Sequence, residues 1–329
     1  MFFFVLPRQH ALTHCALFLL LCFTACSRES KTNAEGDASP ELAAPPVNTA
    51  ELWKEFNGSL AFTAVQNQIA CGPRPAGSPA LQQARELIIA SLAASGWSTE
   101  TQSFPAETPH GQIQMTNLLA RFPTHKGQAP DLNAQKVVIA SHYDTKKFTT
   151  ISFVGANDGA SSTGALLELA RVLALDPALA TQVELVFFDG EEAFQQFTET
   201  DGLYGSRHYA ALLRESGRNT NFKYGILWDM IGDKDLTITL PLDSPKDLTQ
   251  GVLSSAEALQ SRQYFRIFDR PVLDDHVPLN QIARIPTLDI IDFDYTPWHT
   301  ADDTLEQLNP ASLQTIGAVT LHFLCQTLR

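Results

Sequence analysis

The stretch Leu185-Val-Phe-Phe-Asp-Gly-Glu-Glu-Ala-Phe194 joins a short apolar run to three carboxylates within four positions. The run from Val183 to Phe188 has the length and composition of a strand that is buried on both faces. Asp189, Glu191 and Glu192 follow directly at its end. Carboxylates this close repel one another unless a cation or shared protons offset their charge, although an isolated Asp-Gly-Glu-Glu is equally typical of a solvated turn.

Apolar runs of this kind alternate with helical patterns along the chain. Val137 to Ala140 and Tyr224 to Trp228 have the composition of further buried strands. Helical spacing of apolar residues occurs in four segments, which are Ser78 to the residue before Gly96, Ser161 to Leu175, Tyr204 to Leu213, and the segment that starts at Asn309-Pro310. Continuous apolar strands between helices predict a mainly parallel central sheet flanked by helices, in a single α/β domain.

The first 26 residues have the pattern of an export signal. Arg8 precedes an apolar run from Cys15 to Thr24 that is too short to span a membrane comfortably. The sequence Phe23-Thr-Ala-Cys26 resembles the end of a bacterial lipoprotein signal, in which Cys26 is lipidated and becomes the mature N-terminus. Ordinary secretion with cleavage nearby is the alternative. In both cases we expect export to the periplasm, with a lipid at Cys26 as the only membrane anchor.

Composition separates a tether from a catalytic domain. Residues 27–50 are rich in Ala, Pro, Ser and charged residues, which predicts a flexible tether before a folded part at 51–329. A formal charge of −13 argues against nucleic acid as a partner. Outside the signal segment, Cys71 and Cys325 either pair or stay as buried free thiols. The sequence has no CxxC motif, which excludes a thiolate zinc site.

Acidic and imidazole groups follow the predicted strands, where ligands gather in parallel sheets. They include His142, Asp144, Asp158, Asp189, Glu191, Glu192, Asp229, Asp274, Asp275, His276 and His299. Several have ordinary readings when taken alone, such as a helix N-cap for Asp158 and a solvated turn for Asp274 and Asp275. Taken together, imidazoles and carboxylates without cysteine predict a catalytic zinc site that keeps an open position. One of the two adjacent glutamates would then bind metal while the other faces the substrate.

Several of these segments resemble the zinc-exopeptidase superfamily. They are Cys71-Gly-Pro-Arg-Pro-Ala-Gly-Ser78, His142-Tyr-Asp144, Asn157-Asp-Gly-Ala160, Glu191-Glu192 and Trp298-His-Thr300. Within that superfamily the chain is more similar, from about residue 51 onward, to the animal-type (type II) glutaminyl-peptide cyclotransferases. The segments that carry the closer likeness are Ser141 to Phe148, Phe187 to Phe194, Leu203 to His208, Asp274 to His276 and Trp298 to Thr300.

One spacing favours the cyclotransferases over the aminopeptidases of the superfamily. The aminopeptidases usually pass from Glu-Glu to the Gly-Ser turn in a few residues, whereas residues 193–202 intervene here, as the cyclotransferase insert does. Trp298 before the histidine also resembles the cyclotransferases, because the peptidases more often have tyrosine there.

The resemblance implies roles for individual residues. Asp158, Glu192 and His299 match the zinc ligands, and Glu191 matches the general acid/base. The two aspartates that bind around the substrate amide and Glu191 are matched by Asp229 and Asp274. The chain departs from the animal enzymes at Phe197, where they have a pocket tryptophan, and near Asp289, where they have a histidine.

The implied activity is zinc-dependent conversion of N-terminal glutamine to pyroglutamate with release of ammonia, on peptides or proteins. The alternative is a di-zinc aminopeptidase, in which His142 and Asp229 hold a second zinc and Asp158 bridges the pair. Because His142 and Asp229 are both present, the sequence allows two zinc ions, although the resemblance to the cyclotransferases favours one. A third hypothesis is a lipoprotein without catalysis that binds peptide N-termini, against which the intact Glu191 and ligand set argue.

Overall fold

A computed structural model describes residues 48–125 and 127–329 of the chain. The predicted signal segment and the predicted tether as far as residue 47 lie outside the described residues. The first element is a 3-10 turn, η1 (Thr49–Glu55), which begins two residues before the predicted start of the folded part at Glu51. Within the described ranges, no helix is long and apolar enough to cross a bilayer.

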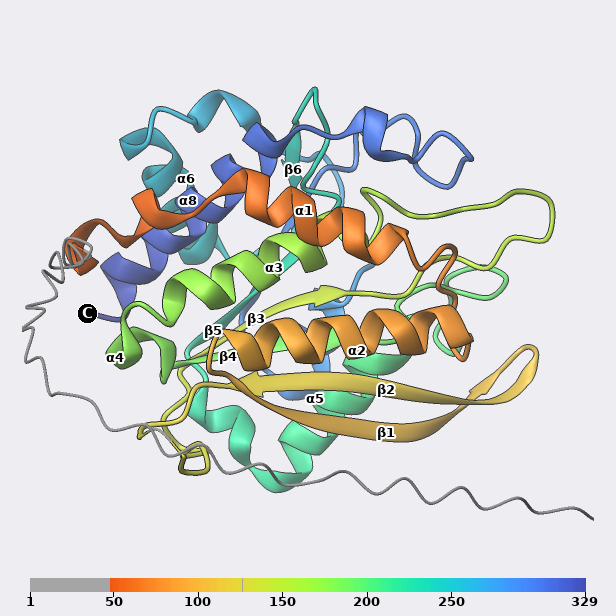
Figure 1. The fold of residues 1–329 in the computed structure, drawn as a ribbon, viewed down its shortest axis with the longest axis horizontal. Coiled ribbons are helices and arrows are strands. Elements are labelled where there is room, and N and C mark those ends of the chain that lie inside the picture. Colours follow the sequence, from red (N-terminus) through yellow and green to blue (C-terminus); the bar gives the residue numbers. More distant parts are fainter. Residues whose placement is uncertain (1–47, 126) are drawn as a thin grey trace, which may run out of the picture. The chain divides into compact units, whose positions relative to one another are not determined.

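The centre of the fold is a six-stranded sheet with the strand order β1-β2-β4-β3-β5-β8 (Figure 1). The four strands from β4 to β8 in this order pair in parallel, while β2 pairs antiparallel with both β1 and β4. The bounds are β1 (Ser98–Thr108), β2 (Gly111–Arg121), β3 (Val137–His142), β4 (Val183–Phe188), β5 (Tyr224–Asp229) and β8 (Thr287–Ile291). The prediction of a mainly parallel central sheet is confirmed.

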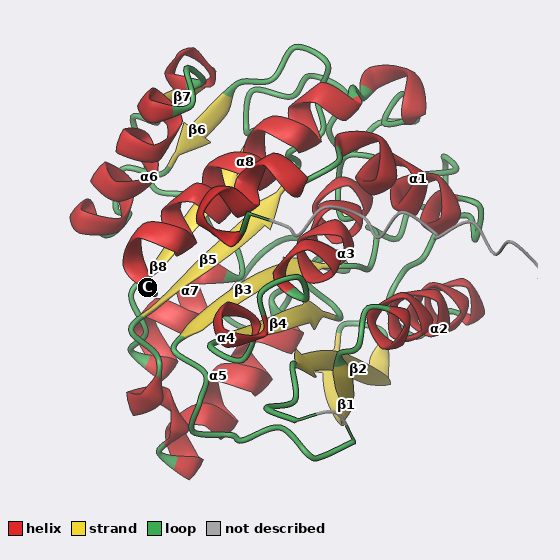
Figure 2. Cartoon of the chain, turned by 60° about the vertical axis from the view of Figure 1, so that its left-hand side comes forward, coloured by secondary structure: helices red, strands yellow, loops and turns green. Residues whose placement is uncertain are grey.

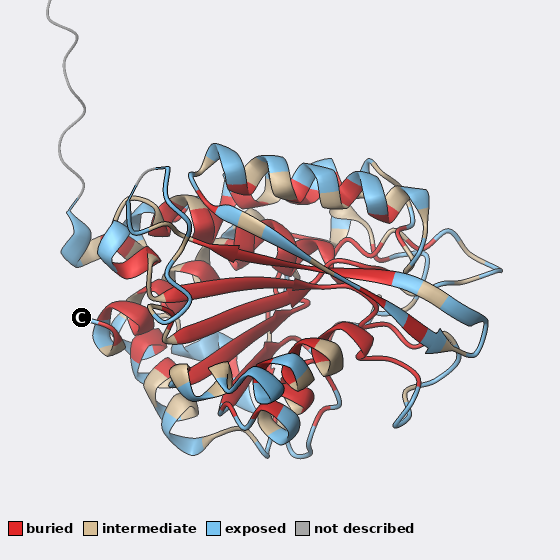
Figure 3. Ribbon diagram, turned by 90° about the horizontal axis from the view of Figure 1, so that it is seen from below, coloured by how far each residue is buried: buried red, intermediate tan, exposed pale blue. Residues whose placement is uncertain are grey.

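The inner strands are apolar throughout because both of their faces are covered. In β3, Val137 and Ile139 pack into one core cluster, and Val138 and Ala140 pack into a second cluster on the opposite face. Figures 2 and 3 show the buried strands between two layers of helices. The larger layer comprises α1 (Gly58–Ile69), α2 (Pro79–Ala94), α3 (Ala160–Leu173), α6 (Lys246–Ala258) and α8 (Pro310–Thr327). The opposite layer comprises α5 (Tyr204–Ser216), α7 (His276–Pro278) and η4 (Leu279–Ala283).

Capping residues fix the helix ends that the sequence predicts. The side chain of Ser78 accepts a hydrogen bond from the Leu81 amide, and Pro79 occupies the first turn of α2. Asn309 and Pro310 begin α8 in the same way. Helix α5 continues to Ser216, beyond the predicted end at Leu213, and stops at Gly217.

The sequence pattern does not predict three strands of this sheet, namely β1, β2 and β8. Most residues of β1 are polar and exposed on the edge of the sheet, whereas polar residues interrupt the apolar runs of β2 and β8. The remaining elements are short connections, together with a small two-stranded sheet. They are α4 (Pro177–Ala180), η2 (Arg218–Asn221), β6 (Ile238–Leu240), η3 (Arg262–Tyr264), β7 (Phe265–Ile267) and η5 (Leu305–Gln307). Cys71 and Cys325 are free thiols. Of the two alternatives that the sequence left open, the structure therefore has free thiols and not a disulfide.

Candidate active site

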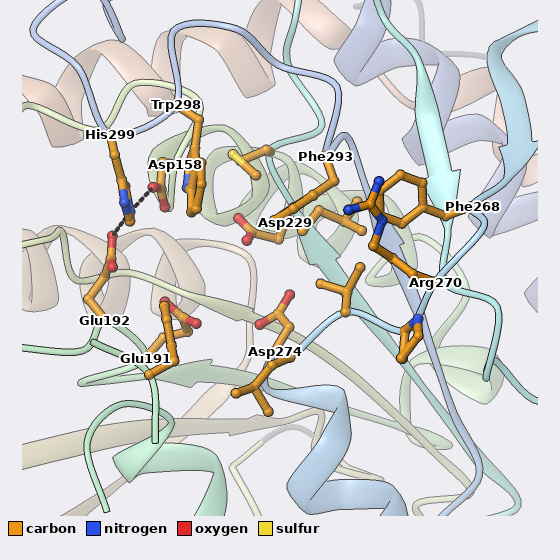
Figure 4. A pocket seen from close by; sticks show the side chains of 16 residues that line it. Asp158, Glu191, Glu192, Asp229, Phe268, Arg270, Asp274, Phe293, Trp298 and His299 are labelled. Carbon is orange, nitrogen blue, oxygen red and sulfur yellow. Dashed lines mark hydrogen bonds and ion pairs between the residues drawn. The ribbon is translucent and has the colours of Figure 1, made fainter. Parts of the chain in front are cut away.

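The carboxyl ends of β3, β4 and β5 bring the predicted site residues to one edge of the sheet (Figure 4). His142 is the last residue of β3 and Asp229 the last residue of β5. Glu191 and Glu192 follow β4 after the turn at Gly190. All four side chains are buried. The solvated-turn interpretation of the two glutamates is therefore wrong.

Three side chains converge as a set of metal donors. His299 Nε2 lies 3.2 Å from Glu192 Oε1 and 3.3 Å from Asp158 Oδ2 (Figure 4). The three residues come from separate parts of the chain, namely the loop before α3, the loop after β4 and the segment between β8 and α8. Their donor atoms all lie within 4.8 Å of one another, which is close enough for one ion to contact all three.

The geometry of this set fits zinc. Bonds of about 2.0–2.1 Å in a tetrahedral site place neighbouring donor atoms about 3.3 Å apart, close to the separations of His299 from the two carboxylates. Asp158 Oδ2 and Glu192 Oε2 are buried without a hydrogen-bond partner. Burial and the neighbouring Asp158 raise the pKa of Glu192 to about 7. Buried, unpaired oxygens of this kind are what a cation would satisfy.

The backbone before α3 holds Asp158 in place. Gly159 has a positive φ of 87°, and a Cβ atom there would lie 2.8 Å from the Asp144 carbonyl oxygen and 3.0 Å from His142 Cε1. Only glycine therefore lets this loop approach β3 so closely. The N-cap of α3 is Gly159, and no side chain caps the helix. The N-cap interpretation of Asp158 is wrong, because its carboxylate faces the donor set instead.

Asp303 connects two of the donor segments, and the sequence does not predict it. Its carboxylate accepts hydrogen bonds from the Asn157 amide at 2.7 Å, the Asp158 amide at 3.1 Å and the Tyr295 hydroxyl at 2.8 Å. Burial and the nearby Asp158 raise the pKa of Asp303 to about 6. The only available signal was its position shortly after His299, in a run that otherwise resembles an exposed turn.

His299 is fixed by aromatic rings and by its backbone. Trp298 stacks on its imidazole with ring centroids 4.1 Å apart, while Phe148 and Phe153 meet it edge-on at 5.7 and 5.8 Å. Its φ of 56° lies in the left-handed region that non-glycine residues seldom adopt. Such strain is common at functional sites, where the surrounding structure imposes it. His299 is therefore more than a packed aromatic residue, because its ring nitrogen faces two carboxylates.

Asp144 organises the two glutamates without facing the donor set. Its carboxylate accepts hydrogen bonds from the Glu191 amide at 3.1 Å and the Glu192 amide at 3.4 Å. Glu192 can then face His299, while the adjacent Glu191 lies on the floor of the pocket (Figure 4). Burial, with Glu192 and Asp274 nearby, raises the pKa of Glu191 well above its usual range despite the opposing effect of His142. Glu191 is thus a buried carboxyl group beside the metal donors but not among them.

A second group of donors shares Asp158 with the first. His142 Nε2 lies 3.2 Å from Asp229 Oδ1 and 3.3 Å from Asp158 Oδ1. The two oxygens of Asp158 therefore face different histidines, as they would in a bridging carboxylate. Burial opposes charge on His142, but Asp229 and the other nearby carboxylates outweigh it and raise the pKa of His142 well above its usual value.

A pocket of about 190 Å³ opens over these groups. Of the residues singled out from the sequence, it is lined by Asp158, Glu191, Glu192, Phe197, Asp229, Asp274, Trp298 and His299. Phe197 comes from the 193–202 insert, whose turn is closed by hydrogen bonds from the amides of residues 194–196 to Asp201. The insert therefore forms one wall of the pocket.

The acidic segment at Asp274 is also buried. Asp274 and Asp275 are 2% and 0% exposed, so the interpretation of this pair as a solvated turn is wrong. Asp274 lines the pocket, and burial together with Asp229 and Asp275 raises its pKa well above the usual range. Asp289 does not reach the pocket and instead lies 3.4 Å from His276 Nδ1. Asp289, His276 and the pocket residue Asp274 form a third group of donors that lie within 4.8 Å of one another.

This arrangement suits chemistry at an amide. A metal held by three protein ligands keeps a position for a carbonyl oxygen, and a buried carboxyl group beside it can move a proton. The pocket has room for a small side chain between apolar walls formed by Trp298 and Phe197.

Comparison with known proteins places the chain among relatives of similar size. The model of peptidase family M28 matches residues 117–324. A bovine glutaminyl-peptide cyclotransferase-like protein is 32% identical over 284 residues, which are 78% of this chain and 72% of the bovine protein. The crystal structure of an Acidobacteriales bacterium glutaminyl cyclase superposes with a TM-score of 0.73 at 35% identity, covering 86% of this chain and 96% of that one. A zinc-dependent exopeptidase from Parabacteroides distasonis is 25% identical, with a TM-score of 0.73 and coverage of 82% and 98%.

Proposed function

The chain belongs to peptidase family M28 and, within it, to the glutaminyl-peptide cyclotransferases, and from this premise we propose that it converts N-terminal glutamine to pyroglutamate. Its substrates are peptides or proteins that begin with glutamine. The observation that carries the proposal is the insert at residues 193–202, which places Phe197 on a pocket wall beside Glu191 and the metal donors. The pocket over these groups, with a volume of about 190 Å³, has room for the side chain of a glutamine.

Asp158, Glu192 and His299 are proposed to hold one zinc ion. When bound, zinc supplies a Lewis acid that polarises the side-chain carbonyl of the substrate glutamine. The α-amine of the substrate forms a bond to that carbonyl carbon, and the bond from the carbon to the amide nitrogen breaks. Glu191 takes the proton that the amine loses and returns it to the departing nitrogen, which leaves as ammonia.

The other pocket residues orient the glutamine. Asp229 and Asp274 lie in the middle of the pocket, between His299 and Glu192 at one end and Phe268 and Arg270 at the other (Figure 4). There their carboxyl groups can bind the substrate amide and the α-amine. Trp298, stacked on His299, provides a flat apolar wall against the methylene groups of the glutamine. Holding the amine and the carbonyl together in this way contributes to the rate because the reaction joins two ends of one residue.

The test is product analysis on two peptides that differ only at the first residue. The purified protein should release ammonia from a glutamine-first peptide and leave the peptide otherwise intact. An alanine-first peptide of the same sequence should stay unchanged. Removal of the first residue from either peptide, without cyclisation, would overturn the proposal.

A second candidate is a di-zinc aminopeptidase. The observation that favours it is the His142–Asp158–Asp229 donor set, in which Asp158 is placed to bridge two ions. In that enzyme Glu191 would activate a water molecule for hydrolysis of the first peptide bond. Two tightly bound zinc ions per chain, together with trimming of the alanine-first peptide, would establish it.

We also propose that the protein is exported and anchored by a lipid on Cys26. The signal pattern of residues 1–26 supports this localisation. Expression of the full chain in a bacterium should place it in the membrane fraction, and Cys26→Ala should release it to the soluble periplasmic fraction or block its processing. Equal distribution of both forms between the fractions would contradict the lipid anchor.

A further inference from the structure

The pocket continues from the metal donors along a row of aromatic side chains. Phe293 lies 5.2 Å from Trp298, and Phe268 lies 6.0 Å from Phe293, measured between ring centroids. Figure 4 shows this row leading from His299 at one end of the pocket to Phe268 at the other. Trp298 and Phe293 are 38% and 39% exposed, so the row offers apolar surface to a bound molecule.

Arg270 ends the row. Its guanidinium carbon lies 4.9 Å from the centroid of the Phe268 ring, and its Nε donates a hydrogen bond to the neighbouring Asp269. The two terminal nitrogens have no protein acceptor among the described residues. Stacking on a ring in this way restricts the side chain while leaving the donor edge of the guanidinium exposed.

Charge is divided between the two ends of the pocket. Carboxylates crowd the end that holds the metal donors, whereas Arg270 is the only lysine or arginine among the described residues that line the pocket. The whole chain carries a formal charge of −13, so this cation stands out against a negative background. An arginine so placed recognises a carboxylate through paired hydrogen bonds.

The direction of the substrate follows from its chemistry, given the proposed function. The reacting side chain and the α-amine belong to the first residue and occupy the acidic end. The rest of the peptide leaves through its α-carbonyl, and each further residue extends it by at most about 3.5 Å. The aromatic row, which leads from the acidic end to Arg270, is the surface of the pocket that the second and third residues can contact.

We propose that Arg270, held over Phe268, selects substrates by a carboxylate at the second or third residue. The carboxylate comes either from an acidic side chain or from the C-terminus of a short peptide. The aromatic row contacts the apolar parts of the same residues. This inference rests on the proposed cyclisation and adds the class of peptide that the site prefers.

The test compares kcat/KM for amidated peptides that differ only in the charge of one residue. Gln-Phe-Glu-amide should exceed Gln-Phe-Lys-amide by about threefold to tenfold at low salt, and the ratio should fall toward one at high salt. A parallel pair with glutamate or lysine at the second residue locates the position. Gln-Phe with a free C-terminus, compared with its amide, separates a terminal carboxylate from an acidic side chain.

Variants assign the preference to Arg270. Arg270→Ala should bring the ratio close to one, and Arg270→Glu should invert it. The matched control is Arg266→Ala, because Arg266 is also exposed, lies 3.5 Å from Asp294 and does not line the pocket. Both values of kcat/KM in a ratio are measured on the same preparation, so a lower fraction of folded enzyme does not change the ratio.

The outcomes are distinct. A wild-type ratio near one for every pair, or a ratio that Arg270→Ala leaves at the wild-type value, overturns the inference while the cyclase activity stands. Absence of any cyclisation overturns the proposed function and this inference with it.

Discussion

The two ends of strand β4 carry buried carboxylates in opposite environments. At the start of the strand, Glu184 is bound by the guanidinium of Arg121, by Arg218 Nη2 at 2.9 Å and by the Tyr209 hydroxyl at 2.6 Å. Burial alone would raise its pKa, but the two arginines outweigh burial and lower the pKa of Glu184. At this end of the strand, both oxygens of the buried carboxylate have partners.

Beyond the other end, neither Glu191 nor Glu192 contacts an arginine among the described residues, and Glu192 Oε1 faces only His299 Nε2 at 3.2 Å. Lys146 Nζ lies 3.6 Å from Glu192 Oε2, a contact too long for a hydrogen bond, and that oxygen has no hydrogen-bond partner. The pKa of each glutamate is raised, first by burial and then by neighbouring carboxylates. The contrast teaches that a buried acid held by arginines cannot lose its charge without loss of stability, whereas buried acids without a cationic partner indicate a site for a ligand.

The largest effect is expected for Glu191→Gln. Removing the group that moves the proton should lower kcat by about 10²- to 10⁴-fold. Because Glu191 is unpaired and buried, the neutral variant should be at least as stable as the wild type. Steady-state cyclisation and a thermal melt of the same preparation check both points, and a large fall in melting temperature would contradict the comparison.

Glu184→Gln is the matched change at the paired end. It leaves two arginine side chains without their shared carboxylate, so the free energy of unfolding should fall by about 3–5 kcal/mol. Metal content per folded chain should not change, because Glu184 lies at the opposite end of the strand. Urea unfolding with metal analysis of the folded fraction measures both quantities.

Low pH should reduce the difference in unfolding free energy between the wild type and Glu184→Gln. The pKa of Glu184 is lowered in the folded state, so its contribution to stability is present above its unfolded value of 4.5 and is lost as the pH falls below it. The gap in unfolding free energy between wild type and Glu184→Gln should therefore be smaller at about pH 3 than at about pH 6. A gap that widens in acid would show that the arginines do not hold Glu184 ionised.

A smaller effect is expected for Asp303→Asn. The amide can still accept hydrogen bonds, but it loses the charge that holds the Asn157 and Asp158 amides. Loss of a residue that orients a metal ligand typically weakens metal binding by about 10- to 100-fold. Zinc titration against a competing chelator measures the change, and Asp302→Asn is a matched control, because Asp302 is exposed and does not line the pocket.

His142→Ala should have the smallest effect on metal content. In the one-zinc proposal His142 contacts Asp158 and Asp229 without binding the ion, so about one zinc per chain should remain. Activity should fall only through the altered positions of those carboxylates. A fall from two tightly bound ions to one, with activity abolished, would favour the aminopeptidase.

The sequence predicts the acidic end of the sheet better than the residues that support it. Asp158, Glu191, Glu192 and Asp229 stand directly after apolar runs or before a helix, and parallel strands bring such positions together. Asp303 gives no such signal, because its partners are backbone amides of a loop far away in sequence.

The sequence pattern also fails to show which polar residues are buried. Asp274 and Asp275 resemble a solvated turn in sequence, but tertiary packing encloses them beside Asp229. Strand β1 escapes prediction because an edge strand needs few apolar residues, and β2 and β8 escape it because polar residues interrupt their apolar runs. Local pattern therefore locates three of the core strands, β3, β4 and β5, and the chemistry at their ends, while long-range packing decides the rest.

The most direct test is the zinc content of Glu191→Gln and Glu192→Gln, purified and counted side by side. The account assigns Glu192 to the metal and Glu191 to the proton, although the two are adjacent in the chain. It predicts that Glu191→Gln keeps the wild-type amount of zinc without turnover, while Glu192→Gln loses the zinc. Equal loss of zinc from both variants would contradict the account.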